Sequence, residues 1–135
     1  MVDDKIGKKS YLGIIIDYDK EKTFDKFSLD TLKDRYFWEG ETHAQEAFAR
    51  ASVFAATYQG ETDYELAQRL YNYSSDRWFM FSTPILSNGG TTRGLPISCF
   101  LNYVPDSRSG LSAHYDENIW LASSGGGIGG FWGDV

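Results

Sequence analysis

Cysteine, proline and long apolar runs are scarce in this chain of 135 residues. It has 1 Cys and 3 Pro, and no run approaches the roughly 18 apolar residues that a membrane span needs. A single cysteine excludes an internal disulfide and favours a reducing, cytoplasmic setting. The first residues, MVDDKIGKKS, are charged and no apolar segment follows them, so no secretory signal is visible. We therefore expect a soluble, cytoplasmic chain of about one domain.

Positive charge is also in short supply. The chain has 13 Lys and Arg against 19 Asp and Glu, a net charge of −6. This balance argues against a nucleic-acid partner, because such binders usually carry a basic surface. Residues that build a core are plentiful, since 41% of the chain is hydrophobic and 16% is aromatic. The composition therefore predicts a folded chain rather than a disordered one.

Glycine and lysine are distributed unevenly. All 7 lysines fall in the first 33 residues, whereas 10 of the 14 glycines fall in the last 50. Glycine beside small polar residues lets a backbone approach a ligand closely, so the second part is the better candidate for a site. The chain stops directly after its densest glycine stretch, where a complete domain usually ends in a docked element or a polar tail. This pattern indicates a cut end.

Residues 1–80 are expected to form a mostly helical scaffold. A β-branched run at 11–18 predicts one short buried strand, and the charged stretch after it predicts solvated surface. Capping boxes at 42–45 and 62–65 predict the starts of two helices, with Gly60 ending the first and the second continuing to about residue 80. Such a pair is typical of a helical hairpin.

Residues 81–135 are expected to carry the chemistry. Turn-forming residues dominate 81–96, and Thr83, which precedes a proline, is biased to extended geometry. A strand is predicted at 97–104, then a polar turn, then a helix at 111–124. The glycine run at 125–130 then predicts a helix terminator and a flexible turn. Cys99 lies on the strand with loops on both sides, and loops on a rigid scaffold often carry reactive residues.

Taken alone, these features allow weaker interpretations. A lone cysteine on a strand is most often a small buried hydrophobe, and redox work needs a partner thiol that this chain lacks. The glycine run could form an anion-binding nest, but it does not match a P-loop or a dinucleotide fingerprint. His43 and His114 have no carboxylate or thiol at ligand spacing, so no metal site is predicted.

An ordered set of motifs is more specific than any one of them. STPILSNGG, LPISCFL, the PDS turn and SSGGGIGG, in this order and spacing, resemble the large, catalytic subunit of ribonucleotide reductases. The resemblance is strong over 78–135 and extends back to about residue 35 through DRYFWEGETHAQEAFARAS. It implies an α/β fold in which a helical N-terminal region precedes the first strand and helix of a ten-stranded barrel. It also implies reduction of ribonucleotides to deoxyribonucleotides for DNA synthesis.

The resemblance implies roles for five residues around the substrate. Thr83 matches a position that helps to bind substrate phosphate, and Ser98 matches a serine that contacts substrate. Cys99 matches one of the two cysteines that deliver reducing equivalents and become a disulfide in each turnover. Gly126 and Gly127 match small residues whose backbone lies against the substrate.

A second group would serve regulation. Asp106, Ser107 and Arg108 match the start of the family's specificity-effector site, which binds deoxynucleoside triphosphates or ATP near the dimer interface. The radical-bearing cysteine, the partner of Cys99 and the tail cysteines lie later in the family and are absent from this sequence. The chain is therefore expected to be a fragment of a longer polypeptide or the N-terminal product of a split or intein-interrupted gene.

Partners follow from the same resemblance. They are the C-terminal part of the large subunit, a second large subunit, a radical-generating small subunit, and thioredoxin or glutaredoxin as reductant. We expect the chain to bind no cofactor directly, with the radical coming from a diiron small subunit or from adenosylcobalamin. Two alternative hypotheses for the function stay open. One is a non-catalytic nucleotide-binding or regulatory module derived from the family, and the other is a plain structural domain. A pure effector binder would have no need of the Cys99 thiol.

Overall fold

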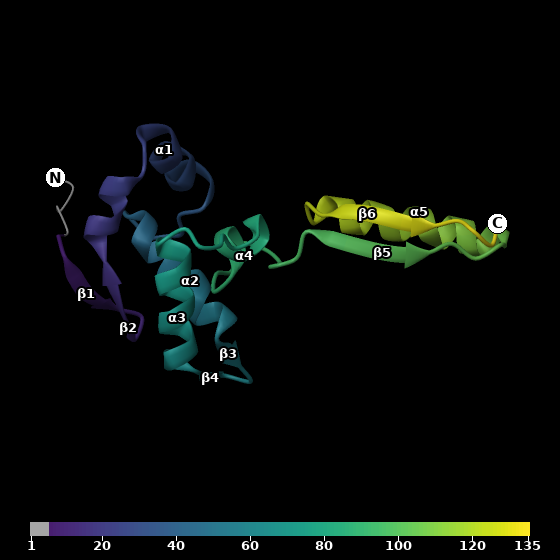
Figure 1. Cartoon of the computed structure of the whole chain (residues 1–135). Helices are drawn as coiled ribbons and strands as arrows, with labels where there is room; N and C mark the ends of the chain where they lie inside the picture. The colour runs from purple at the N-terminus through teal and green to yellow at the C-terminus, as the bar shows by residue number, and fades with distance from the viewer. Residues whose placement is uncertain (1–5) are drawn as a thin grey trace. The chain divides into compact units, whose positions relative to one another are not determined.

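A computed structural model describes residues 6–135; residues 1–5, part of the charged N-terminal stretch, lie outside the described residues. The chain divides into two compact units, the first ending at Pro96 and the second running from Ile97 to Val135. Each unit has its own helices and strands (Figure 1). The division follows Pro96, whereas the two functional regions expected from the sequence meet at residue 80.

The first unit opens with a β-hairpin rather than the single strand predicted over 11–18. Strand β1 (Lys8–Tyr11) pairs antiparallel with β2 (Ile14–Asp17). The turn between them lies at Leu12 and Gly13, whose φ angles are 50° and 85°. Two positive φ angles in succession are typical of the two-residue turn that joins twisted antiparallel strands. The prediction was wrong because the run carries a leucine, not a polar residue, at the first turn position.

Strand β2 has one buried and one exposed face. Ile14 and Ile16 are buried, while Ile15 between them is exposed, because side chains alternate along a strand. The side-chain amide of Gln68 pairs with the backbone of Ile15, accepting from its N–H at 2.7 Å and donating to its carbonyl at 2.9 Å. The Tyr71 hydroxyl accepts a further hydrogen bond from the backbone of the same strand. Hydrogen bonds with Gln68 and Tyr71 thus attach the hairpin to the helix at Tyr64–Ser75.

A charged segment follows, as predicted. It forms the 3₁₀-helix η1 (Tyr18–Thr23) and helix α1 (Lys26–Arg35), in which Leu32 is the one buried residue. Asp25 caps α1 by accepting from the backbone of Ser28 at 2.8 Å. Hydrogen bonds from the hydroxyl and the backbone N–H of Ser28 hold the pKa of the Asp25 carboxyl below its ordinary value.

The predicted pair of helices is present, with a different connection. Helices α2 (Ala44–Ala55) and α3 (Tyr64–Ser75) pack against each other (Figure 1). A short hairpin of β3 (Thr57–Tyr58) and β4 (Glu61–Thr62) joins them. Gly60, expected to end the first helix, instead lies in the turn of this hairpin with a φ of 85°. Helix α3 also ends at Ser75 and does not reach residue 80.

Both helix starts are shifted by one residue from the predicted capping boxes. His43 is the N-cap of α2, and the Glu46 carboxylate accepts from the backbone N–H groups of Thr42 and His43 at 2.7 and 3.2 Å. Asp63 is the N-cap of α3 and accepts from the backbone of Leu66 at 2.9 Å. At α3 the cap residue itself supplies the acceptor, whereas at α2 the acceptor is the Glu46 carboxylate. Pattern alone located both starts to within one position.

Helix α2 is the centre of the first unit. Every residue from 44 to 52 is buried, so the helix is covered on all sides rather than along one stripe. Phe48 is fully buried and stacks on Phe24 with ring centroids 6.1 Å apart. Alanines on the helix allow its neighbours to approach closely, and they form much of the hydrophobic core with Ile16, Ala67, Tyr71 and Leu86.

A short helix occupies part of the region predicted to be turns. Helix α4 (Thr83–Asn88) begins at Thr83, with Pro84 in its first turn. Proline is well tolerated there because the first backbone N–H groups of a helix have no intrahelical acceptor. The prediction of extended geometry at Thr83 is therefore wrong, because Thr83 is the first residue of a helix. Gly89 follows the helix and is packed against Phe54, where a side chain would collide.

The second unit is a β-α-β arrangement. Strand β5 (Cys99–Tyr103) is followed by helix α5 (Arg108–Ser123) and by β6 (Gly127–Phe131), which pairs parallel with β5 (Figure 1). The glycine run was expected to be a flexible turn, and this is wrong from residue 127 onward. A strand–helix–strand crossover brings parallel strands side by side, so the run can complete a ladder.

The fold class is confirmed at the level of mixed helix and strand. Within residues 97–135, all of which are described, the sheet has two strands, and a ten-stranded barrel is not shown. Of these residues only Val104 and His114 are buried. The expected strand at 97–104 and helix at 111–124 are both present, with the helix starting three residues earlier at Arg108.

Candidate functional site

Cys99 is the first residue of β5, and its side chain is exposed. The hydroxyl of Ser98 lies 3.6 Å from its sulfur atom. This position leaves the thiol free to meet a reactant while the strand behind it fixes its place. No second cysteine is present in the sequence, so Cys99 cannot form a disulfide within this chain.

The glycine run lies directly beside this cysteine. In the parallel register Cys99 is opposite Gly127, and the Gly127 N–H donates to the Ser98 carbonyl at 2.7 Å. Gly126 packs so closely on the Phe100 ring that a Cβ would lie 2.6 Å from its Cδ2. The structure thus brings together four residues proposed to contact substrate or carry electrons, at the start of the two strands.

The three proposed effector residues lie at the opposite end of β5. Ser107 is the N-cap of α5 and accepts from the Gly110 N–H at 3.0 Å. Asp106 precedes it in the turn and Arg108 is the first residue of the helix. All three are exposed. Because β5 rises about 3.3 Å per residue, the strand itself separates this group from the thiol.

Thr83 belongs to the first unit. It is exposed at the start of α4, and its hydroxyl oxygen lies 3.3 Å from the hydroxyl oxygen of Tyr36. Its backbone carbonyl accepts from Ser87 at 2.8 Å within the helix. The seven other proposed site residues all lie in the second unit.

Arg50 and Glu41, which no sequence motif indicated, form a buried ion pair at the end of α4. The Arg50 Nε and the Glu41 Oε1 atoms are 2.7 Å apart, and the two side chains are 6% and 2% exposed. A usable signal was present, since a charged residue inside the apolar helix AQEAFARASVFA requires a buried partner.

A polar cluster around the buried His114 connects α5 to the strands. Asn102 on β5 donates to Asn118 at 2.9 Å, and the Asn118 amide lies 3.0 Å from His114 Nε2. The His114 ring meets Trp132 edge-on, with centroids 5.0 Å apart. These contacts hold the helix against the carboxyl ends of the two strands.

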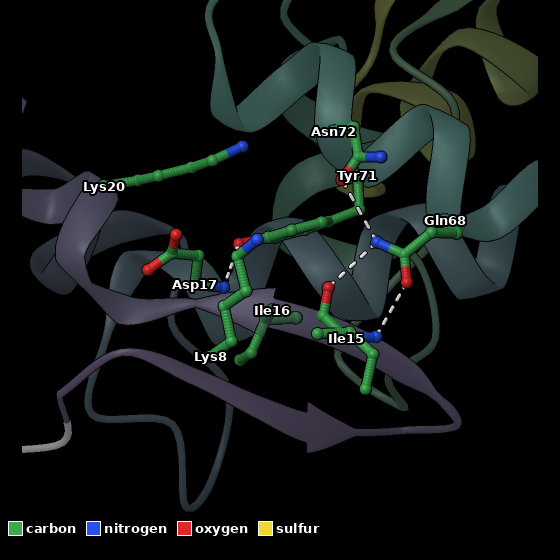
Figure 2. A pocket seen from close by; sticks show the side chains of 8 residues that line it. All are labelled: Lys8, Ile15, Ile16, Asp17, Lys20, Gln68, Tyr71 and Asn72. Carbon is green, nitrogen blue, oxygen red and sulfur yellow. Dashed lines mark hydrogen bonds between the residues drawn. The ribbon is translucent and has the colours of Figure 1, made fainter.

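The first unit contains a cavity of about 400 Å³ between the β1–β2 hairpin and α3 (Figure 2). None of the proposed site residues lines it. Its polar side chains already serve other groups: Gln68 bonds the backbone of Ile15, Tyr71 donates to Gln45 at 2.7 Å, and Lys20 pairs with Asp76 at 2.8 Å. Burial raises the pKa of Tyr71 to about 12, so its hydroxyl keeps its proton at neutral pH. We assign the cavity no ligand.

Among residues 6–135 no three His, Cys, Asp or Glu side chains gather closely enough to hold a metal ion. No helix in the same range is both long and apolar enough to cross a membrane.

Comparisons with known proteins identify the same family that the sequence motifs resemble. Residues 22–94, more than half of the chain, match the family described as "Ribonucleotide reductase, all-alpha domain". The chain is 41% identical over 116 residues to the ribonucleoside-diphosphate reductase large subunit of Invertebrate iridescent virus 6. It is 45% identical over 116 residues to the large subunit of Invertebrate iridescent virus 3. Each match covers 86% of this chain.

A solved structure agrees with these matches. The class Id ribonucleotide reductase alpha subunit of Actinobacillus ureae aligns with 82% of this chain at a TM-score of 0.69 and 34% identity, and the alignment covers 21% of that subunit. The chain spans 12% and 18% of the two viral large subunits. By its matched residues, its identities and its fold, the chain belongs to the ribonucleotide reductase large-subunit family, in the N-terminal region of that subunit.

Proposed function

We propose that this chain supplies the N-terminal portion of a ribonucleotide reductase large subunit and acts with the downstream part to reduce ribonucleotides. The observation that carries the proposal is the pairing of an exposed Cys99 with Gly127 at the start of two parallel strands. A thiol fixed at a strand end, beside a backbone without side chains, suits close approach to a sugar ring.

In this proposal Cys99 is one of two thiols that supply the electrons. The two thiols lose two electrons and two protons and become a disulfide, while the ribose loses its 2′-hydroxyl as water and gains a hydrogen at that carbon. The second thiol belongs to the downstream part, because this chain has one cysteine. A reductant of the thioredoxin or glutaredoxin class then returns the disulfide to two thiols. The reaction starts from a radical that a diiron small subunit or adenosylcobalamin supplies.

Substrate binding is assigned to small polar groups rather than to cationic side chains. Thr83 contacts substrate phosphate and Ser98 contacts the nucleotide, with Gly126 and Gly127 presenting backbone to it. Hydroxyls and backbone N–H groups can hold an anion without lysine or arginine. A ribonucleoside diphosphate is the proposed substrate, since the viral relatives are named for that reaction.

The proposal also includes an effector site and a dimer of large subunits. Asp106, Ser107 and Arg108 contact a deoxynucleoside triphosphate or ATP effector, close to where two large subunits meet. The setting is cytoplasmic, because thiol chemistry of this kind needs a reducing compartment. The second candidate is a nucleotide-binding or regulatory module without catalysis. The exposed position of Cys99 beside the glycine run favours the first, since an effector binder has no use for that thiol.

Replacement of the sulfur tests the proposal. In the large subunit assembled from this chain and the downstream part, Cys99→Ser should abolish multiple turnover with thiol reductants. Nucleotide binding should stay within about tenfold, or about 1.4 kcal/mol, because the substitution keeps size and removes redox capacity alone. Ser98→Ala, at the residue before Cys99, should raise KM but retain multiple turnover, because it removes a substrate contact and leaves the thiol in place. Undiminished multiple turnover by Cys99→Ser would remove Cys99 from the mechanism.

A further inference from the structure

Three segments of the first unit converge on the guanidinium of Arg50. Its Nε and Nη2 atoms donate to the two carboxylate oxygens of Glu41 at 2.7 and 3.2 Å. Its Nη1 atom donates to the Gly89 carbonyl at 2.7 Å, and Nη2 also donates to the carbonyls of Leu86 and Tyr36 at 3.0 and 2.9 Å. One side chain of α2 therefore holds the end of α4 and the loop after α1.

The geometry of this cluster requires arginine. The guanidinium is a planar fork that serves a carboxylate in a bidentate manner and still reaches backbone carbonyls around it. Arg50 is 5% exposed, so each bond it makes is shielded from water. Lysine would keep the charge, but its single ammonium group cannot reach the carboxylate and the carbonyls of Leu86 and Gly89 in the same way.

This cluster reaches Thr83 by two routes. Helix α4 has 6 residues, so fixing its end at Leu86 and Gly89 also fixes its start at Thr83. The second route passes through Tyr36, whose carbonyl accepts from Arg50 and whose hydroxyl oxygen lies 3.3 Å from that of Thr83.

Arg93 holds the same loop from outside. It donates to the carbonyls of Arg35 and Phe37, and its guanidinium lies over the Trp38 ring at 5.3 Å from the centroid. The backbone on both sides of Tyr36 is thus restrained, so the Tyr36 hydroxyl has a defined place. Thr83 itself is exposed and available to a ligand.

We propose that Arg50, paired with Glu41, is a positioning residue for substrate phosphate: it holds α4 and Tyr36 so that the Thr83 hydroxyl is presented in one orientation. This inference rests on the proposed function, in which Thr83 contacts the phosphate. Arg50 touches no substrate and acts through Thr83. Its effect should therefore appear in substrate affinity and depend on the presence of the Thr83 hydroxyl.

The test is a double-mutant cycle in the assembled large subunit, with a ribonucleoside diphosphate as the probe. Arg50→Lys should raise KM about tenfold and leave kcat within about threefold, since it removes hydrogen bonds from a charged donor. Thr83→Val should raise KM by at least as much. The double variant should match Thr83→Val within about twofold, because a positioning residue has nothing left to position.

Two further variants separate positioning from loss of folding. Tyr36→Phe removes one hydroxyl at the surface of the unit and should raise KM about threefold, again with no added effect in the absence of the Thr83 hydroxyl. Arg69→Lys is the matched control, because Arg69 is exposed on α3, and its KM should not change. Tyr36→Phe keeps the inference testable even if Arg50→Lys fails to fold.

The outcomes are distinct. If Thr83→Val raises KM and neither Arg50→Lys nor Tyr36→Phe does, the inference is overturned and the proposed function stands. If the effects of Arg50 and Thr83 simply add, Arg50 supports folding without positioning the hydroxyl, and the inference is again overturned. If Thr83→Val leaves KM unchanged, the phosphate role of Thr83 falls and the inference falls with it.

Discussion

Asp106 is proposed to act in effector binding rather than in the reaction itself. It lies in the turn after β5, at the end of the strand opposite Cys99. The pKa of Tyr103 is raised first by the hydrogen bond from its hydroxyl to Asp134, then by desolvation, and last by the nearby Asp106 charge. The carboxylate of Asp106 is exposed and available to a hydroxyl of a bound nucleotide.

Asp106→Ala should therefore weaken effector binding and leave basal turnover almost unchanged. A hydrogen bond to a charged group contributes about 1.5–3 kcal/mol, so the effector Kd should rise about ten- to a hundredfold. Equilibrium binding of a deoxynucleoside triphosphate to the assembled subunit gives the value. Asp116→Ala, an exposed carboxylate on α5, is the matched control. An intact effector response in Asp106→Ala would mean that the turn only connects β5 to α5 and that Asp106 does not contact the effector.

At the same scale, the sequence indicated which residues could react but not what holds them. Cys99, Ser98 and the glycines were proposed from an ordered set of motifs, and the structure places them side by side. Arg50 and Glu41 were not proposed from the sequence, because their role depends on contacts that are distant along the chain. Arg50 donates to carbonyl groups at the end of α4 and at Tyr36. A pattern along the chain shows a buried charge but not the segments that converge on it.

At the scale of elements, strands β5 and β6 depend on glycine at particular places. A Cβ on Gly126 would collide with the Phe100 ring, whereas one on Gly127 would lie 3.7 Å from the Ser98 carbonyl oxygen, an ordinary contact. Gly126→Ala should thus destabilise the second unit by about 1–3 kcal/mol, the usual effect of overpacking.

Gly127→Ala is the matched control and should leave stability near the parent value. Amide hydrogen exchange of residues 99–103, compared between the two variants, reports the difference. Equal protection in both variants would mean that Phe100 moves aside without loss.

The elements themselves were predicted with uneven success. Both long helices of the first unit carried clear spacing and start signals and were found within one residue of their predicted starts. The hairpins were missed, since Leu12 gave no turn signal and Gly60 was equally compatible with a helix end. Strand β6 was missed because glycine weakens a strand as an isolated segment, and its partner β5 stabilises it through long-range pairing.

At the scale of the whole molecule, the second unit exposes several large apolar side chains. Leu101 is 91% exposed and Trp120 is 68% exposed, and β5 and β6 form a sheet of two strands. A sheet this small is marginal on its own, and its free edges are templates for pairing with another chain.

The isolated chain should therefore associate at concentrations at which the assembled subunit stays discrete. Sedimentation velocity over a concentration series measures this. Leu101→Asp should reduce the association, because it places a charge on the exposed strand. A chain that sediments as a monomer throughout and melts in one cooperative transition would contradict the expectation and revive the reading of a self-sufficient module.

We propose above all that Cys99 delivers electrons to the ribonucleotide. The most direct measurement is the redox state of Cys99 in the assembled enzyme after a single turnover without added reductant, read by thiol alkylation and mass spectrometry. Cys99 should be lost from the thiol pool and appear in a disulfide with a cysteine of the downstream part, in proportion to the deoxyribonucleotide formed. Product formed while Cys99 remains fully alkylated as a free thiol would rule out this role.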